Sequence, residues 1–233
     1  MTHRKNKVNE LKNLLKLILD FYTRRDHEVK KEIKIPHFAL LKFLNNGFDI
    51  SPSQSSKIRN MVKHFKKYEG KGLIIFGESG SGKTLLLLYT FTLFLYKIYK
   101  SEIASHRAEK PDNFDPSSQI FLKDIYWVDS VRCINSFKLK DIPSIEKILE
   151  RPILFFDNLD ILKRENKEER RILKDVIISR YDYGLCSFIT TDMKLITLYK
   201  LRKNFYFRQF CERLLDKERF LRIFIEGGSK RKV

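Results

Sequence analysis

The clearest chemical signal in the sequence is a glycine-rich segment that ends in a lysine and a threonine. Residues 77–84 read GESGSGKT and fit the pattern G-x-x-x-x-G-K-[ST], a P-loop. Glycines let the backbone of such a loop curl until its N–H groups point at phosphate oxygens. The lysine can reach the β- and γ-phosphates of a nucleoside triphosphate, and the threonine hydroxyl can ligate Mg²⁺. We predict that a triphosphate is bound by Gly77, Glu78, Ser79, Gly80, Ser81, Gly82, Lys83 and Thr84.

A carboxylate at the end of an apolar run is the second candidate. Residues 153–157 read ILFFD, a pattern typical of a buried strand with Asp157 at its carboxyl end. A strand that ends in aspartate is weak evidence alone, but about 70 residues after a P-loop the pattern favours a Mg²⁺ ligand. We therefore expect Thr84 and Asp157 to hold the metal. We also expect the strand of Asp157 to lie beside the strand that leads into the P-loop.

The elements that must position these residues follow from the hydrophobic pattern. Short apolar runs at residues 73–76, 125–128, 153–156, 187–190 and 222–225 are typical of buried parallel strands. Helical patterns separate them, at residues 83–100, 131–137, 145–149 and 168–181. Strands that alternate with helices predict an α/β fold, a five-stranded parallel sheet flanked by helices. The P-loop then joins the first strand to the helix at 83–100.

The N-terminal part differs from the rest in charge. We predict a basic helical extension at residues 1–50, with apolar residues at helical spacing in 7–23, and a core at 51–233. The net charge is +18, of which residues 1–70 carry +9 (16 Lys and Arg against 7 Asp and Glu) and the other 163 residues carry +9 (31 against 22). This density suggests a polyanion such as nucleic acid as partner. A lysine-rich composition that promotes solubility explains it equally well.

Cysteine usage and hydropathy argue against several classes of protein. Cys133, Cys186 and Cys211 lie far apart, so they predict neither a zinc site nor a disulfide framework, and a reducing compartment fits. The apolar residues near the N-terminus are interrupted by charges and form no signal peptide core. The longest uncharged stretch, residues 84–96, is shorter than the roughly 20 residues that a helix needs to span a bilayer. We expect a cytoplasmic protein with no membrane partner.

Several segments, in their order along the chain, resemble AAA+ ATPases of the DnaC/IstB/DnaI type, a group of bacterial helicase loaders and transposase helper ATPases. The resemblance covers about residues 52–233. It rests on KGLIIFG at residues 71–77, IYWVD at 125–129, the segment 146–160 around Asp157, ISRY at 178–181, SFITTD at 187–192, FCERL at 210–214 and GGSKR at 227–231.

The resemblance implies a fold and a set of roles. It implies a P-loop NTPase fold of AAA+ type, and ATP with Mg²⁺ as cofactors. The sequence continues only to residue 233 after Arg231, so we expect a fold without a C-terminal lid domain. Arg213 would act as an arginine finger on ATP held by a neighbouring subunit, with Arg208 as the second choice, so the chain would self-associate through a shared ATP site. Arg231 would contact the nucleotide. The implied function is to load or remodel a replicative DNA helicase on single-stranded DNA.

Two positions depart from the family pattern. Asn158 stands where the family usually has a second acid after Asp157, and Asp192 takes the sensor-1 position, which is usually Asn. Asn cannot take a proton. Our hypothesis exchanges the two roles, so that Asp192 orients or activates water and Asn158 hydrogen-bonds the γ-phosphate. The alternatives are weak hydrolysis or an acid supplied by Asp160.

Three rival functions remain at this point. An IstB-like transposase helper uses the same core, so the sequence does not distinguish it from a helicase loader. A non-hydrolysing ATP switch that holds DNA or protein is kept open by Asn158. A small-molecule kinase needs an arginine-rich substrate lid between the later strands, and the sequence shows no such block.

Overall fold

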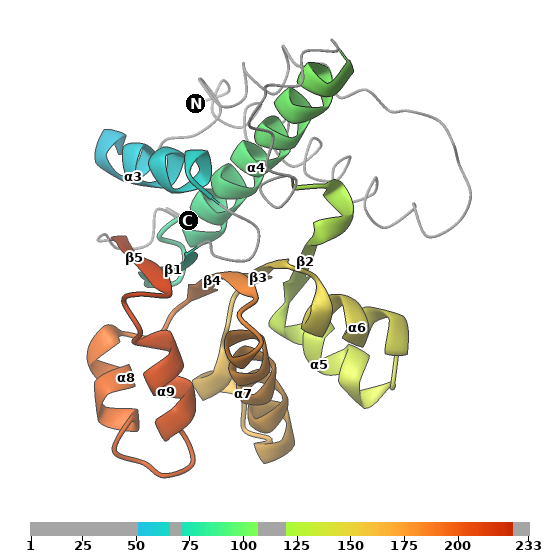
Figure 1. The fold of residues 1–233 in the computed structure, drawn as a ribbon. Coiled ribbons are helices and arrows are strands. Elements are labelled where there is room, and N and C mark those ends of the chain that lie inside the picture. Colours follow the sequence, from blue (N-terminus) through green and yellow to red (C-terminus); the bar gives the residue numbers. More distant parts are fainter. Residues whose placement is uncertain (1–50, 66–70, 107–119, 226–233) are drawn as a thin grey trace, which may run out of the picture. The chain divides into compact units, whose positions relative to one another are not determined.

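The computed structural model describes residues 51–65, 71–106 and 120–225. The predicted N-terminal extension at residues 1–50 and the predicted nucleotide contact Arg231 lie outside these residues. The element labels below are those of Figure 1.

The core is a five-stranded parallel sheet in the order β2-β3-β4-β1-β5 (Figure 1). The strands are β1 (Gly72–Gly77), β2 (Ile125–Asp129), β3 (Ile153–Asp157), β4 (Cys186–Thr191) and β5 (Phe220–Ile225). The predicted five-stranded parallel sheet is confirmed, and each predicted strand lies within two residues of the observed one.

The order of the strands corrects one expectation. The strand of Asp157, β3, is not beside the P-loop strand β1, because β4 pairs with both and separates them. The crossover through helix α7 (Lys167–Asp182) returns the chain from β3 to this central position. The carboxyl end of β4 therefore lies between the ends of β1 and β3.

Helices cover both faces of the sheet (Figure 1). On one face α4 (Lys83–His106) packs on β1, β3 and β4, and α3 (Pro52–Lys63) packs on α4. The other face carries α5 (Ser130–Lys138), α6 (Ile142–Glu150), α7, α8 (Leu195–Leu201) and α9 (Arg208–Leu214). Two short 3-10 turns complete the described elements, η2 (Leu122–Asp124) and η3 (Ile161–Lys163).

Apolar side chains on the two faces of the strands build two cores. Toward α4 the core is aromatic: the ring of Phe155 stacks on Phe188 at 4.8 Å, and Phe94 meets both rings edge-on. Toward α7 and α9 the core is mostly aliphatic, with fully buried Ile74 and Leu154. The P-loop and the end of β3 are thus attached to strands that are buried on both faces, which holds their positions rigidly.

A buried arginine joins two elements of this framework. Arg180 of α7 is fully buried and donates hydrogen bonds to the carbonyl oxygens of Ile148 (2.9 Å), Arg151 (2.9 Å) and Cys186 (2.7 Å). Burial lowers the pKa of Arg180 to about 9. These bonds tie the end of α6 to the start of β4, so the arginine of the ISRY segment acts in the framework of the fold.

Candidate nucleotide site

The P-loop has the backbone geometry that its glycines allow. Gly82 has a φ of 98°, in the left-handed region that residues with a Cβ rarely adopt. At Gly77 a Cβ would lie 2.6 Å from the Ser81 hydroxyl oxygen and 3.1 Å from the carbonyl oxygen of Ile225, so a larger residue would crowd the loop. The buried Ser81 hydroxyl has no hydrogen-bond partner among the described residues. A nucleotide phosphate would supply the missing partner.

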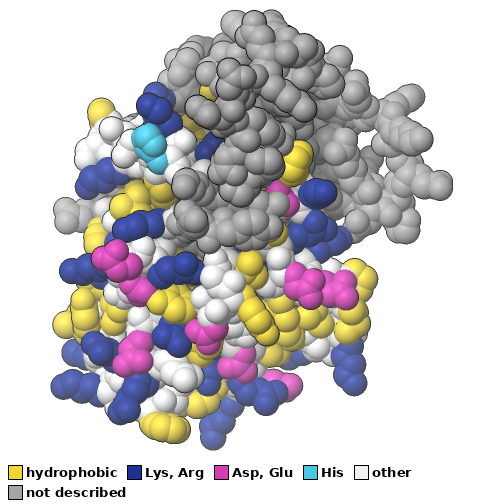
Figure 2. Space-filling view, in the orientation of Figure 1, with side chains coloured by type: hydrophobic (Ala, Val, Ile, Leu, Met, Phe, Trp, Pro, Cys, Tyr) yellow, Lys and Arg dark blue, Asp and Glu magenta, His cyan; other side chains and the backbone are white. Residues whose placement is uncertain are grey.

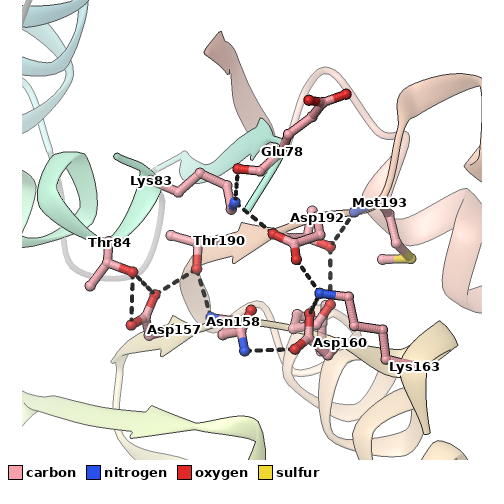
Figure 3. A network of polar contacts seen from close by, with 12 residues as sticks. Glu78, Lys83, Thr84, Asp157, Asn158, Asp160, Lys163, Thr190, Asp192 and Met193 are labelled. Atoms are coloured by element: carbon pink, nitrogen blue, oxygen red, sulfur yellow. Dashed lines mark hydrogen bonds and ion pairs between the residues drawn. The ribbon is translucent and has the colours of Figure 1, made fainter. Parts of the chain in front are cut away.

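The two predicted metal ligands lie in contact (Figure 3). The Thr84 hydroxyl, at the start of α4, donates to the two carboxylate oxygens of Asp157 at 3.0 and 3.1 Å. From β4, the Thr190 hydroxyl donates to Asp157 Oδ1 at 2.6 Å. Burial raises the pKa of Asp157, and the hydrogen bonds from Thr190 and Thr84 partly oppose that rise. This pair of hard oxygen donors fits a Mg²⁺ ion that accompanies a triphosphate.

The P-loop lysine is already paired within the chain. Lys83 is only 7% exposed, and its ammonium group donates to the carbonyl oxygen of Glu78 at 2.8 Å. The same ammonium lies 2.6 Å from Asp192 Oδ1, just beyond the end of β4. Lys163 of η3 hydrogen-bonds the other carboxylate oxygen, Oδ2 (Figure 3). Burial acts to raise the pKa of Asp192, but the hydrogen bonds from Lys163 and Lys83 outweigh it and hold that pKa below its ordinary value.

Asn158 is held beside the site by its own contacts. Its φ is 60°, a left-handed conformation that Asn adopts more readily than most residues. Its side-chain amide donates to Asp160 Oδ2 at 2.6 Å, and its backbone N–H donates to the Thr190 hydroxyl at 2.6 Å. Asp160 in turn lies 3.7 Å from Lys163, which reaches Asp192. The two exchanged residues are therefore linked through Asp160 and Lys163.

The structure brings most of the predicted site residues together. The P-loop, Thr84, Asp157, Asn158 and Asp192 lie at the carboxyl edge of β1, β3 and β4 (Figure 3). The Glu78 side chain is exposed and pairs with Lys194 at 3.6 Å. The roles assigned to Asn158 and Asp192 remain predictions, because their contacts here are with protein groups.

Arg213 lies away from the P-loop site. It is in α9, where its guanidinium Nη2 is 3.0 Å from Asp182 Oδ1 and its side chain lies over the ring of Tyr181 at 4.7 Å. Asp182 ends α7, just before β4 begins, so this cluster belongs to the amino edge of the parallel sheet. Because the P-loop is at the carboxyl edge, contact between Arg213 and a nucleotide requires a second copy of the chain. Arg208, the second choice, is exposed.

Sequence reasoning missed two residues of the site. Thr190 orients Asp157 and Asn158, and a polar residue inside an apolar strand was the signal for it. Lys163 pairs with Asp192, and no pattern distinguishes it from the many other lysines.

Other kinds of site find little support in the described part of the chain. There, no group of three or more His, Cys, Asp or Glu side chains could hold a metal ion. The three cysteines are buried and free, and burial raises the pKa of both Cys133 and Cys186 to about 12. No helix in the described ranges is long and apolar enough to cross a membrane. Among the described residues in view in Figure 2, Lys and Arg side chains are spread out and interspersed with Asp and Glu, without a single basic patch.

Comparisons with known proteins identify the fold. No protein-family model matches the sequence, and none of the curated proteins matches it. Among solved structures, the fold is similar to the crystal structure of the DnaC helicase loader, with a TM-score of 0.56 and 19% identity over 78% of this chain and 95% of that chain. It is also similar to the crystal structure of DnaI, with a TM-score of 0.54 and 18% identity over 85% of this chain and 95% of that chain. The chain therefore has a P-loop fold of the AAA+ type found in DnaC and DnaI.

Proposed function

We propose that this chain binds and hydrolyses ATP with Mg²⁺ and uses the nucleotide to load or remodel a replicative DNA helicase on single-stranded DNA. The observation that carries the proposal is the contact between Thr84 and Asp157 at the end of a P-loop, in a fold shared with DnaC and DnaI. The proposal assigns residues 1–50 to a basic helical extension, residues 51–233 to the ATPase core, and the chain to the cytoplasm.

Each residue of the site has its own role in nucleotide binding or hydrolysis. ATP with Mg²⁺ supplies a hydrolysable phosphoanhydride bond and a compact double positive charge. Lys83 and the P-loop N–H groups bind the phosphates, and Thr84 and Asp157 hold the metal. Thr190 fixes the orientation of the Asp157 carboxylate through its 2.6 Å hydrogen bond. Asp192 and Asn158 flank the position of the terminal phosphate, where one orients water and the other donates a hydrogen bond.

Two observations support a shared site between copies of the chain. The cations that pair with Asp192 beside the P-loop are Lys83 and Lys163, and Arg213 lies at the opposite edge of the sheet. An arginine finger contributed by a neighbour stabilises the charge that develops on the transferred phosphoryl group. We therefore propose that the functional form is an oligomer in which Arg213 of one copy faces the P-loop of the next.

A non-hydrolysing switch is the alternative that a specific contact favours. No acid follows Asp157 directly, and the side-chain amide of Asn158 already donates one of its two N–H groups to Asp160. Such a protein would bind ATP, change shape and hold its partner without turnover. An IstB-like transposase helper uses the same fold and is separated from a helicase loader only by its partner.

Identification of the partner tests the proposal. Tagged protein is used to capture partners from extracts of cells that encode it, with ATP and Mg²⁺ present, and Lys83→Ala serves as the matched control that cannot hold ATP. Capture of the replicative helicase by the wild type and not by Lys83→Ala is the expected result. Capture of a transposase instead would establish the helper role, and capture of neither would overturn both.

A further inference from the structure

The P-loop lysine and Asp192 form an ion pair at the place where the phosphates of a nucleotide would bind. The Lys83 side chain is only 7% exposed, and among the described residues its ammonium group contacts the Glu78 carbonyl oxygen and Asp192 Oδ1. The carboxylate is itself mostly buried, at 16% exposure. A buried ammonium needs a charged or strongly polar partner, and here the chain supplies a carboxylate where a phosphate oxygen would otherwise bind.

Lys163 gives Asp192 a second cation. It hydrogen-bonds the carboxylate oxygen that Lys83 leaves free, and it also lies 3.7 Å from Asp160 Oδ1. Its side chain is 58% exposed, so it can follow Asp192 at little cost in packing. The hydrogen bond from Lys163 to Asp192 raises the pKa of Lys163, which keeps the ammonium charged.

Nucleotide binding changes the balance of charges around Asp192. When phosphates take Lys83, Asp192 loses one of its two cations and faces an added group of negative charges. A carboxylate left unpaired in a buried position beside like charges is strongly unfavourable. Lys163 prevents this, because it retains a hydrogen bond to Asp192 that does not depend on Lys83. The need is greater for a triphosphate than for a diphosphate, since the triphosphate carries the additional negative group.

We propose that Asp192 competes with the nucleotide for Lys83, and that Lys163 is a positioning residue that keeps Asp192 paired once a triphosphate has taken Lys83. This inference rests on the proposed nucleotide site and adds to it a carboxylate that restrains binding and a lysine that makes the site selective for the triphosphate. Neither role follows from the P-loop motif, because both depend on the contact between the end of β4 and η3.

A double-mutant cycle on Asp192 and Lys163 tests the inference. Affinities for ADP and for a non-hydrolysable ATP analogue are measured with Mg²⁺ by isothermal titration calorimetry. Asp192→Asn is expected to raise both affinities, and Lys163→Ala to lower the affinity for the ATP analogue, each by about three- to tenfold, with a smaller effect of Lys163→Ala on ADP. In the Asp192→Asn background, Lys163→Ala should have no effect. Lys163→Arg should bind as the wild type does.

One further measurement, with its control variant, isolates the contact itself. Without nucleotide, Asp192→Asn should lower the melting temperature by about 2–4 °C, because Lys83 stays buried without its charged partner. Lys138→Ala is the matched control, since Lys138 forms a 2.6 Å pair with Glu169 outside the site. The Lys138→Ala variant should leave the affinities for ADP and for the ATP analogue unchanged.

The outcomes separate this inference from the proposed function. If the wild type binds neither nucleotide, the proposed function fails and the inference fails with it. If the wild type binds both, but Lys163→Ala has the same effect in both backgrounds or Asp192→Asn weakens binding, the inference alone is overturned.

Discussion

Thr84 at the start of α4 donates hydrogen bonds to both carboxylate oxygens of Asp157 at the end of β3, although β4 separates β3 from β1, the strand that leads into the P-loop. The two side chains meet across the carboxyl end of β4, where Thr190 also contacts Asp157. In this arrangement the two predicted metal ligands are held side by side by protein contacts. Such preorganisation lowers the cost of ordering the site when nucleotide and Mg²⁺ arrive.

Removal of the P-loop lysine should abolish nucleotide binding. Lys83→Ala deletes the motif's only ammonium group and leaves the backbone of the loop in place. Loss of charge-assisted hydrogen bonds of this kind lowers affinity by about 10- to 100-fold or more. Titration with a fluorescent ATP analogue in the presence of Mg²⁺ measures the loss, and Lys138→Ala serves as the control. If Lys83→Ala binds as tightly as the wild type, the P-loop assignment is wrong.

Removal of the Asp157 charge should uncouple nucleotide binding from Mg²⁺. In Asp157→Asn the amide can still accept a hydrogen bond from Thr84, but the site loses its carboxylate ligand. ATP affinity should then be nearly the same with Mg²⁺ as with EDTA, whereas the wild type gains affinity with Mg²⁺. Asp141→Asn is the matched control, because Asp141 caps α6 at Ser144 and is not among the groups that act on Asp157. Equal Mg²⁺ dependence in Asp157→Asn and wild type would falsify the metal role.

The strands could be predicted from the sequence because their physical cause is local. A parallel strand that is buried on both faces reads as a continuous apolar run, and ILFFD ends at a charge that marks its boundary. Helix α8 has no such local signal in the sequence. It has only seven residues, too few for a clear helical period, and Lys194 at its N-cap makes no side-chain capping bond.

The order of the strands and the contacts of the site depend on the tertiary fold. Nothing in the sequence shows that β4 returns between β1 and β3, and the placement of Thr190 follows from that return. Lys163 is one lysine among many, and only the packing of η3 beside the end of β4 brings it to Asp192. The P-loop could be predicted because its chemistry is confined to eight consecutive residues.

Arg213 should act in trans. Arg213→Ala should leave ATP binding nearly intact, since the side chain lies at the opposite edge of its own sheet. Hydrolysis should fall by roughly 10³-fold or more, as is typical when an arginine finger is lost. Steady-state phosphate release measures the change, and Arg208→Ala tests the second choice. Arg219→Ala is a matched control, because Arg219 also lies over the ring of Tyr181, at 5.4 Å.

A mixing experiment separates action in trans from a defect in folding. Arg213→Ala and Lys83→Ala proteins are each inactive for different reasons, but one interface in a mixed oligomer has an intact P-loop and an intact arginine. Activity should therefore recover in part when the two are combined. No recovery at any ratio, with both variants folded by circular dichroism, would argue against a shared site.

Binding of single-stranded DNA should depend on both salt and nucleotide. The net charge of +18 is compatible with contacts to DNA phosphates. Binding through such contacts weakens linearly on a log–log plot as salt increases, because counterions are released. We expect ATP to be needed as well, if the DNA surface forms between ordered copies of the chain. Fluorescence anisotropy of a labelled oligonucleotide measures both effects. The Lys83→Ala variant, which we expect not to bind ATP, is the control. Tight binding that is independent of both would indicate a different kind of site.

The exchanged pair Asn158 and Asp192 gives a final prediction, on the hydrolysis step. The depressed pKa of Asp192 makes it a poor base while both lysines hold it. Once phosphates take Lys83, one of these cations is gone, and the carboxylate is better able to orient or activate water. Asp192→Asn should then lower turnover by about 10²–10⁴-fold, the range for loss of general-base catalysis, while nucleotide binding is retained or strengthened.

Reversal of the exchange tests whether the two positions share one function. The double variant Asn158→Asp with Asp192→Asn restores an acid after Asp157 and an amide at the sensor position. It should hydrolyse ATP at least as fast as the wild type, because Asp tolerates the left-handed backbone at position 158 as Asn does. Single-turnover kinetics with saturating protein isolate the hydrolysis step from product release. If the Asp192→Asn variant hydrolyses ATP at the normal rate, Asp192 does not orient or activate water. The Asp160→Asn variant then distinguishes the two alternatives that remain, an acid supplied by Asp160 and a protein that acts as a slow switch. A loss of turnover in Asp160→Asn would make Asp160 the acid, and turnover that is slow in the wild type and unchanged in both variants would make the chain a switch.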